Sequence, residues 1–296
     1  MILEQTGAIC EGLYSTGHHL LPAFLLTSPI PVLFDAGVAA MGPRYLKDIE
    51  TYLGRADALK YLLLTHSHYD HCGSIPFLKE KIPGLQTGAH SHASKILGKP
   101  DVVEMMRALN RHFAKVFADV IGDEDIPFNA VKIDFLLKGG DELDFGEGWS
   151  VRVIETPGHT QDSLSFHIPK IKTVIAGEAA GVFHNDGINP QFSSSYRFYL
   201  SSLEKLAALD IDVLALGHGH ILTGDDIGRF LKDSIETTVS FKKKIDDYLD
   251  LFNGEREKVV EAILRENYDE TVLMQQDKRS FLLNLRAQVK VVAEGK

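Results

Sequence analysis

The stretch THSHYDHCG (residues 65–73) places three histidines and one aspartate within six positions, directly after the apolar run KYLLL. In an extended segment, His66 and His68 point the same way because side chains alternate along the backbone. Asp70 and His71 lie where the chain is expected to turn into a helix, so two groups of ligands face two adjacent points. Imidazole nitrogen and carboxylate oxygen are ligands of choice for zinc, iron and manganese. The stretch therefore predicts metal binding, against the plainer interpretation that these histidines merely cluster.

Short β-type runs alternate with turns over the first 225 residues, and each run is apolar or β-branched. Most of the runs end in glycine, histidine or an acid, which predicts that catalytic groups gather at the strand ends. Examples are PVLFDAG (31–37), KYLLLTH (60–66), WSVRVIETPGH (149–159), SLSFHI (163–168), KTVIAGE (172–178) and DVLALGHGH (212–220).

Two regions show helical periodicity. Over residues 101–122, apolar side chains recur at spacings of three and four, which predicts an amphipathic helix inserted between strands. A second, long helix is expected to begin near Asp225, followed by shorter helical patterns in EKVVEAIL and RSFLLNLRAQVKVV. We therefore expect a catalytic domain at 1–225 and a helical C-terminal extension at 226–296 that caps the cleft of the metal site.

The composition is that of an ordinary globular protein, since 296 residues with 44% apolar content can bury a substantial core. The longest apolar runs fall well short of the roughly 20 residues that a membrane helix needs, and the N-terminus does not resemble a signal peptide. We therefore expect a cytoplasmic protein without membrane contact. Two cysteines, Cys10 and Cys72, are expected to stay reduced. The formal net charge of −10 disfavours nucleic acid as a partner.

Five segments together resemble the metallo-β-lactamase superfamily. Over about residues 8–225, LFDAG, THSHYDHCG, TPGHTQDS, AGE and LGHGH follow one another in the order and with the spacing of that family. The resemblance implies an α/β fold, a four-layer αββα sandwich. In it, two mixed sheets pack face to face, helices lie outside, and the metal cleft runs along one edge.

The resemblance also implies seven ligands for two divalent metal ions. The first ion would be held by His66, His68 and His159, and the second by Asp70, His71 and His218. Glu178 stands where the family usually has an aspartate that bridges both ions. Glutamate is one methylene longer, so it could bridge after a backbone adjustment, bind one ion only, or weaken one site. Zinc, iron and manganese all suit this ligand set.

Neighbouring residues are given supporting roles. The family's equivalent of Asp35 supports a ligand histidine, although a turn-forming aspartate is the plainer interpretation. We expect Thr65 to pack in the core. Cys72 follows the ligands at an expected helix N-terminus, which could lower the pKa of its thiol, yet we favour a small buried residue there. His218 is preferred over His220 as a ligand because the family pattern places the ligand between two glycines.

Hydrolysis is the natural reaction of such a site, because two metal ions hold a hydroxide near neutral pH and polarise a carbonyl or phosphoryl oxygen. Asp70 is the expected catalytic residue, orienting this water and accepting its proton. The hydrolase core followed by a helical tail resembles hydroxyacylglutathione hydrolases and the quinolone-signal response type of thioesterase. We therefore expect an enzyme that hydrolyses a carboxylic ester, with a thioester as first choice. The alternatives are a lactone or phosphodiester hydrolase, or a regulatory or signalling protein with a vestigial metal site.

Substrate contacts are expected from the inserted helix, from residues 189–202 and from the tail. Aromatic side chains in the second of these regions could line a pocket for an acyl group, with a neighbouring arginine as an anion contact. Alternatively, half of them are core residues. The candidates are His184, Phe192, Tyr196, Arg197 and Tyr199. The apolar excess of the inserted helix, including Met105 and Phe113, could instead form a homodimer interface.

Overall fold

The computed structural model describes residues 2–3, 6–121, 126–184, 187–268 and 278–296. The chain forms two compact units. Unit 1 contains Met1–Glu155, Asp162–Gly177 and Asp210–Gly224, and unit 2 contains Thr156–Gln161, Glu178–Leu209 and Asp225–Lys296.

The described part of unit 1 holds two sheets of seven strands each. In spatial order, the first sheet contains β2 (Gly7–Cys10), β3 (Leu13–His18), β4 (Leu21–Leu26), β5 (Val32–Phe34), β6 (Tyr61–Leu63), β7 (Gln86–His90) and β8 (Phe135–Leu137). The pairs from β2 to β5 are antiparallel, whereas β5, β6, β7 and β8 run parallel to one another. The carboxyl ends of β5 and β6 therefore lie at the same edge of this sheet.

The second sheet is mostly antiparallel. In spatial order it contains β1 (Ile2–Leu3), β16 (Ile221–Thr223), β15 (Val213–Leu216), β12 (Thr173–Gly177), β11 (Leu164–Ile168), β10 (Ser150–Glu155) and β9 (Glu142–Asp144). Only the pair β12 and β15 is parallel among these.

The alternation of side chains along β4 explains why both faces of the first sheet are covered. All six residues of LPAFLL are buried. Phe24 and Leu26 point into the core between the two sheets, where Phe34 and Phe166 also meet at a ring centroid distance of 5.2 Å. Leu25 belongs instead to a second core on the other face. A near-continuous apolar run is what a strand covered on both faces requires.

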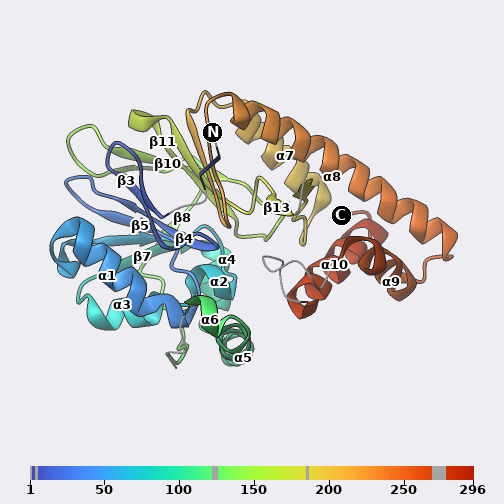
Figure 1. Cartoon of the computed structure of the whole chain (residues 1–296), viewed down its shortest axis with the longest axis horizontal. Coiled ribbons are helices and arrows are strands. Elements are labelled where there is room, and N and C mark those ends of the chain that lie inside the picture. Colours follow the sequence, from blue (N-terminus) through green and yellow to red (C-terminus); the bar gives the residue numbers. More distant parts are fainter. Residues whose placement is uncertain (1, 4–5, 122–125, 185–186, 269–277) are drawn as a thin grey trace. The chain divides into compact units, whose positions relative to one another are not determined.

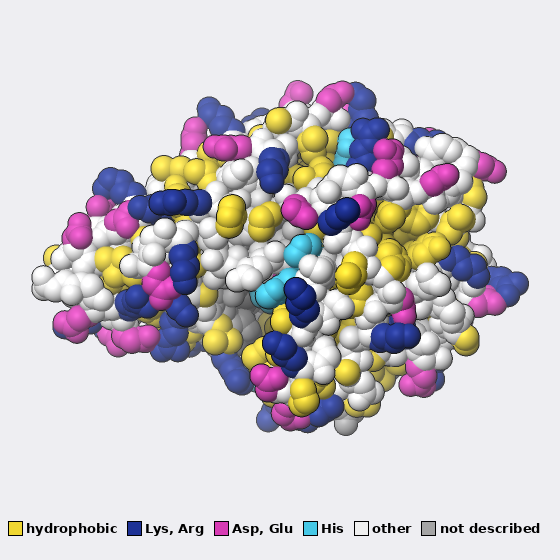
Figure 2. Space-filling model, turned by 180° about the vertical axis from the view of Figure 1, so that it is seen from behind, with side chains coloured by type: hydrophobic (Ala, Val, Ile, Leu, Met, Phe, Trp, Pro, Cys, Tyr) yellow, Lys and Arg dark blue, Asp and Glu magenta, His cyan; other side chains and the backbone are white. Residues whose placement is uncertain are grey.

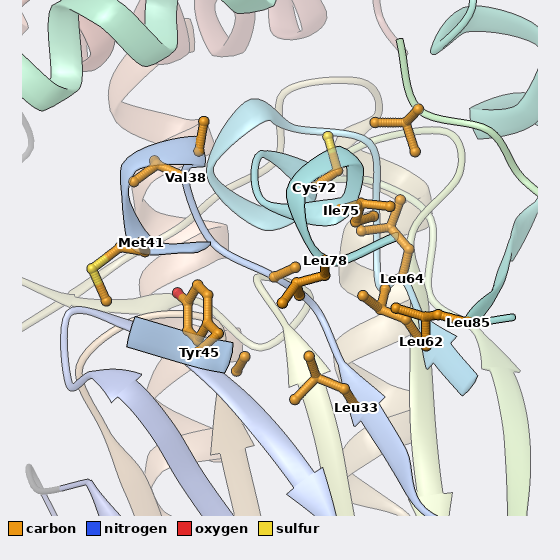
Figure 3. Close-up of a cluster of buried hydrophobic side chains, with 14 of the residues drawn as sticks. Leu33, Val38, Met41, Tyr45, Leu62, Leu64, Cys72, Ile75, Leu78 and Leu85 are labelled. Atoms are coloured by element: carbon orange, nitrogen blue, oxygen red, sulfur yellow. The ribbon is translucent and has the colours of Figure 1, made fainter. Parts of the chain in front are cut away.

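Helices cover this second face of the first sheet (Figure 1). They are α1 (Gly42–Leu53), α2 (Tyr69–Cys72), α3 (Ile75–Lys81), α4 (Ser91–Ile96) and α5 (Pro100–Val116), and the short helix α6 (Ala118–Ile121) follows α5. Figure 3 shows side chains of α1, α2 and α3, including Tyr45, Cys72 and Leu78, packed with Leu33 and Leu62 of the sheet. Burying each large apolar side chain stabilises the fold by about 1.5–3 kcal/mol.

Unit 2 is mainly helical. It contains the hairpin β13 (Val182–His184) and β14 (Gly187–Asn189) and the helices α7 (Tyr196–Ala207), α8 (Asp225–Leu251), α9 (Arg256–Asn267) and α10 (Lys278–Ala293). Gly158 has a φ of 133°, and a Cβ there would stand 2.3 Å from the backbone nitrogen of Tyr199. Only glycine lets the loop before His159 approach helix α7 so closely.

The mixed α/β fold with two sheets and several helices confirms the prediction from sequence. Each expected β-type run contains a strand, and the long helix begins at Asp225 as expected. The expected helix at 101–122 is instead interrupted at Phe117 between α5 and α6, and residue 122 lies outside the described residues. The domain boundary at 225 and the capping role stay predictions. None of the described helices combines the length and the apolar character needed to cross a membrane.

Candidate metal centre

Asp70, His71 and His218 converge in unit 1. Their ligand atoms all lie within 4.8 Å of one another. The Nε2 atoms of His71 and His218 are 3.3 Å apart, and Oδ2 of Asp70 is 3.6 Å from Nε2 of His218. Asp70 and His71 lie on the short helix α2, and His218 follows strand β15. The structure therefore brings together the three residues that the resemblance assigned to the second metal ion.

Asp35 holds His71 in place. The residue follows strand β5 with a φ of 60°, a left-handed conformation that aspartate tolerates better than most residues. Its Oδ2 accepts hydrogen bonds from Nδ1 of His71 at 2.9 Å and from Oγ1 of Thr65 at 2.8 Å. Its Oδ1 accepts from the backbone N–H of Thr65 at 2.8 Å. Because the carboxylate of Asp35 is 2% exposed and fully engaged, it fixes the ring orientation of His71.

His218 is held by backbone rather than by a carboxylate. Its Nδ1 donates to the carbonyl of Leu20 at 2.9 Å, in the turn between β3 and β4. The next carbonyl, that of Leu21, accepts a hydrogen bond from the hydroxyl of Tyr45 on helix α1 at 2.6 Å. Burial raises the pKa of the Tyr45 hydroxyl well above its usual range, so it donates at any working pH. Helix α1 therefore fixes the turn that orients His218.

These anchors decide which nitrogen of each ring carries the proton. Since Nδ1 of both histidines donates, Nε2 of each neutral ring carries a lone pair, and the two lone pairs face each other. Two nitrogens bound to one tetrahedral metal ion at about 2.0–2.1 Å are roughly 3.3 Å apart, which matches the distance observed. With the carboxylate of Asp70 beside them, the residues fit a divalent cation.

His66 and His68 lie in the loop that joins β6 to helix α2. The ring of His66 is 4.1 Å from that of His71 and 4.8 Å from that of His68, measured between centroids. Thr65 donates its hydroxyl proton to Asp35, so its oxygen accepts from Nδ1 of His66 at 3.0 Å. The expectation that Thr65 simply packs in the core was therefore incomplete, because its hydroxyl links Asp35 to His66.

His159 and Glu178 form a close pair in unit 2. Nε2 of His159 lies 2.6 Å from Oε2 of Glu178, and both side chains are buried. Nδ1 of His159 donates to the carbonyl of Gln191 at 2.7 Å. The hydroxyl of Tyr199 donates to the carbonyl of Glu178 at 3.4 Å. The donor atoms of this pair are those that zinc, iron and manganese bind.

A family comparison places this chain among known proteins. The family model of the metallo-beta-lactamase superfamily matches residues 31–218, which is more than half of the 296 residues. The chain belongs to the metallo-beta-lactamase superfamily. The cluster of histidine and aspartate in unit 1 is therefore a divalent-metal-compatible site in a metallo-beta-lactamase fold.

Two curated members of the superfamily resemble the chain. ST1585, a metallo-beta-lactamase fold-containing protein of Sulfurisphaera tokodaii, is 28% identical over 211 residues, which cover 70% of this chain and 75% of that protein. Hydroxyacylglutathione hydrolase of Brucella ovis is 31% identical over 169 residues, which cover 57% of this chain and 51% of the hydrolase. The match thus spans about half the length of that hydrolase.

Solved structures of the superfamily show the same fold. The structure of ST1585 from Sulfolobus tokodaii has a TM-score of 0.60 at 21% identity and covers 97% of this chain and 98% of its own. A metallo-beta-lactamase from Cronobacter sakazakii has a TM-score of 0.61 at 22% identity and covers 82% of this chain and 98% of its own.

The thiol of Cys72, next to the candidate ligand His71, is not reactive. Cys72 is fully buried on helix α2, and burial, with a smaller effect from nearby carboxylates, raises the pKa of its thiol well above the usual range. The interpretation of Cys72 as a small buried residue is therefore confirmed. Because the thiolate is the nucleophilic form, this cysteine does not supply the chemistry of the superfamily fold.

The candidate substrate residues occupy different environments in unit 2. Phe192 and Tyr199 are fully buried, and their rings lie 6.2 Å apart between centroids. Tyr196 is partly buried on helix α7, and Arg197 beside it is exposed. His184 ends strand β13, and its side chain lies outside the described residues. Contact with a substrate stays a prediction for all five.

Proposed function

We propose that this protein is a metal-dependent hydrolase that cleaves carboxylic esters, with a thioester as its preferred substrate. The observation that carries the proposal is the convergence of Nε2 of His71 and Nε2 of His218, at 3.3 Å, beside the carboxylate of Asp70. Members of the superfamily are mostly metallo-hydrolases, so both the donor set and the family favour hydrolysis.

We further propose two divalent ions, which could be zinc, iron or manganese. Asp70, His71 and His218 would hold one, and His66, His68 and His159 the other, with Glu178 as the carboxylate shared between them. This second part rests on family membership and on the chemistry of the donors, because the residues belong to separately described units. When bound, two such ions depress the pKa of a water molecule and polarise a carbonyl oxygen. Asp70 would orient that water and accept its proton.

A thioester is favoured by the similarity to a protein named hydroxyacylglutathione hydrolase and by a cavity in unit 2. The cavity has a volume of about 230 Å³. Among its described lining residues, none is charged, and apolar side chains such as Phe241 and Phe281 alternate with amides such as Gln288. Gln191, whose carbonyl holds His159, also lines it. An uncharged acyl group would find suitable contacts here.

The charge distribution supports a small-molecule substrate. On the face shown in Figure 2, the Lys and Arg side chains lie scattered among Asp and Glu side chains. A chain with a net charge of −10 and such mixed charges offers little attraction to a polyanion.

The proposal is tested with the full chain loaded separately with zinc, iron or manganese. Elemental analysis gives the metal content, and turnover is measured on thioester, lactone and phosphodiester substrates. Replacing Asp70 by asparagine should lower thioester turnover by about 10²- to 10⁴-fold, the usual contribution of a general base. The matched control is Asp57→Asn, an exposed aspartate paired with Arg55. Turnover in Asp70→Asn equal to that of the wild type would refute the mechanism. Faster turnover of the lactone or the phosphodiester would refute the thioester as the preferred substrate.

A further inference from the structure

Unit 1 contains a second cavity, walled by helix α5, by the short 3-10 helix η1 (Ala39–Met41) and by residues 126–128. Its volume is about 180 Å³. Its polar lining among the described residues consists of Arg107, Asn110 and Arg111 on helix α5. None of these three residues is a candidate metal ligand.

The charges around this cavity favour an anion. Glu104 is the acidic partner of both arginines, with Oε2 at 2.5 Å from Arg107 and Oε1 at 3.6 Å from Arg111. Among the described residues, Glu104 is the only carboxylate that forms an ion pair with these two guanidinium groups, so one of their positive charges is left uncompensated by this pairing. Arg107 is also held by its Nε, which donates to the carbonyl of Phe128 at 3.2 Å. A guanidinium fixed in this way offers its remaining N–H groups in a defined direction.

The other described residues that line the cavity are apolar. They are Ala39, Ala40, Ala114, Ile126, Pro127 and Phe128. Ala39 and Phe128 are each 1% exposed, so they form a rigid floor. An apolar cavity of about 150 Å³ accommodates a molecule the size of benzene, and the present cavity is slightly larger. The volume of the cavity, its apolar floor and the two arginines at its rim together suit a ligand with a small ring or a short chain and one carboxylate.

We propose that this cavity binds a small organic carboxylate, with the carboxyl group at Arg107 and Arg111 and the apolar body against Ala39 and Phe128. Arginine suits a carboxylate because its planar donors match the two oxygens. A carboxylic ester hydrolase releases such an acid, so the product of the reaction belongs to this ligand class. That last step rests on the proposed function, whereas the binding site itself does not.

The bound acid would contact the segment from Ala36 to Ala39, which is hydrogen-bonded to His71 and Ser74. Oδ1 of Asn110 accepts a hydrogen bond from the backbone N–H of Ala39 at 2.7 Å. One residue earlier, the carbonyl of Val38 accepts from the hydroxyl of Ser74 at 2.6 Å. The N–H of Ala36 in turn donates to the carbonyl of His71 at 2.7 Å. A ligand on Ala39 therefore lies against the same segment that fixes helix α2.

The test measures benzoate binding to the metal-free full chain by titration calorimetry and by amide NMR shifts. Removing metal keeps benzoate from binding at the metal centre and makes the result independent of turnover. We expect benzoate to bind at least about tenfold more tightly than benzyl alcohol, which has the same ring but no charge. The amides of Ala39 and Arg111 should shift. Equal binding of the two probes, or no binding at all, would overturn the proposal.

Three variants locate the site. The double variant Arg107→Gln/Arg111→Gln should weaken benzoate binding at least about tenfold, because a guanidinium–carboxylate pair is lost. Glu104→Gln should strengthen binding by about two- to fivefold, since it removes the competing carboxylate. A merely structural role of the two arginines does not predict this gain. Arg55→Gln, in an exposed pair with Asp57, is the control and should change nothing.

The single variant Arg111→Gln guards against misfolding of the double variant, because this side chain is 60% exposed. It should still weaken benzoate binding severalfold, and circular dichroism verifies its fold. Benzoate affinity unchanged in Arg111→Gln, or lowered in Glu104→Gln, would contradict the site. If the site is correct and no thioester is hydrolysed, only the proposed function fails.

Discussion

Two groups of candidate ligands use different means to orient a histidine. In unit 1, His71 is held by the buried carboxylate of Asp35, which also binds Thr65 through both of its oxygens. In unit 2, His159 is held by the backbone carbonyl of Gln191. In both arrangements Nδ1 donates to the anchor, so Nε2 points away from the anchor toward the other candidate ligands. They differ in that a side chain can be replaced directly, whereas a carbonyl can be tested only through the residues that hold it.

The two groups of ligands should respond differently to substitutions. The anchor of His71 depends on one negative charge, whose loss changes the proton positions of the ring. The anchor of His159 depends on the position of the segment that follows strand β14, which Gln288 of helix α10 holds by donating to the carbonyl of Pro190 at 2.5 Å. We therefore expect chemical effects from substitutions near His71 and mainly stability effects near Gln191.

Among substitutions of the residues that anchor the histidines, the largest effect is expected for Asp35→Asn. An amide has one acceptor, so it cannot accept from both the Thr65 N–H and the Nδ1–H of His71. If its NH₂ group faces His71, the ring must carry its proton on Nε2, which blocks metal binding. Metal affinity should fall about 10- to 100-fold, the usual loss for such a partner. Calorimetric metal titration measures it, with Asp210→Asn, an exposed partner of Lys172, as the control. Unchanged affinity would show that His71 is oriented without Asp35.

A smaller and more selective effect is expected for Glu178→Asp. The aspartate is one methylene shorter than the glutamate whose Oε2 lies 2.6 Å from Nε2 of His159, and it is the residue usual in the superfamily. If Glu178 takes the shared-ligand position, turnover should stay within about tenfold while the preferred metal changes. Glu178→Ala is the comparison variant. It removes the carboxylate altogether, so its metal content should fall. Equal losses of turnover in Glu178→Asp and Glu178→Ala would count against Glu178 as a ligand shared by two metal ions.

Much of the metal centre could be predicted because its side chains carry the chemistry. The apolar runs before His71 and His218 predict the strands β6 and β15, and the resemblance to the superfamily named both histidines as ligands, a role that stays a prediction. The anchors of His218 and His159 could not, because the carbonyls of Leu20 and Gln191 are the same on any residue. The link from Thr65 to His66 was missed because a threonine after a strand is usually a packing residue.

The N-terminal strands β2, β3 and β4, which supply the turn with Leu20, lie in the region where β-type runs were expected, but the sequence did not locate them individually. The segment from Gly7 to Leu26 has apolar residues on both faces of β4 and several glycines. Its pattern therefore lacks the alternation that marks a half-buried strand. Only the cover of α1 on one face and the second sheet on the other explains that burial.

The third expectation concerns Gln288→Leu, which keeps the side-chain volume and removes the donor. Gln288 is 4% exposed, so the Pro190 carbonyl would lose its partner in a buried place, at a cost of about 1–3 kcal/mol. We expect a lower unfolding free energy by this amount, measured by urea denaturation, with metal affinity nearly unchanged. Gln86→Leu on the exposed end of strand β7 is the control. A tenfold loss of metal affinity in Gln288→Leu without a loss of stability would contradict this expectation, because that is the effect expected for Asp35→Asn.

The smallest effect on metal binding is expected for Tyr45→Phe, which acts on His218 at two removes. Phenylalanine is chosen because it keeps the aromatic ring. Gly17 and Gly37 leave space for that ring, since a Cβ at either position would stand 2.2 or 2.0 Å from Tyr45. Phenylalanine fills that space but leaves the Leu21 carbonyl without its donor, which costs about 1–3 kcal/mol. Because the neighbouring Leu20 carbonyl is also bonded to His218, the turn should loosen and metal affinity should fall by only about two- to fivefold. The amide signal of Leu21 and the metal titration measure the two parts separately. A tenfold or greater loss of affinity would mean that helix α1 controls His218 as strongly as Asp35 controls His71, and the distinction between backbone and carboxylate anchors would then fail.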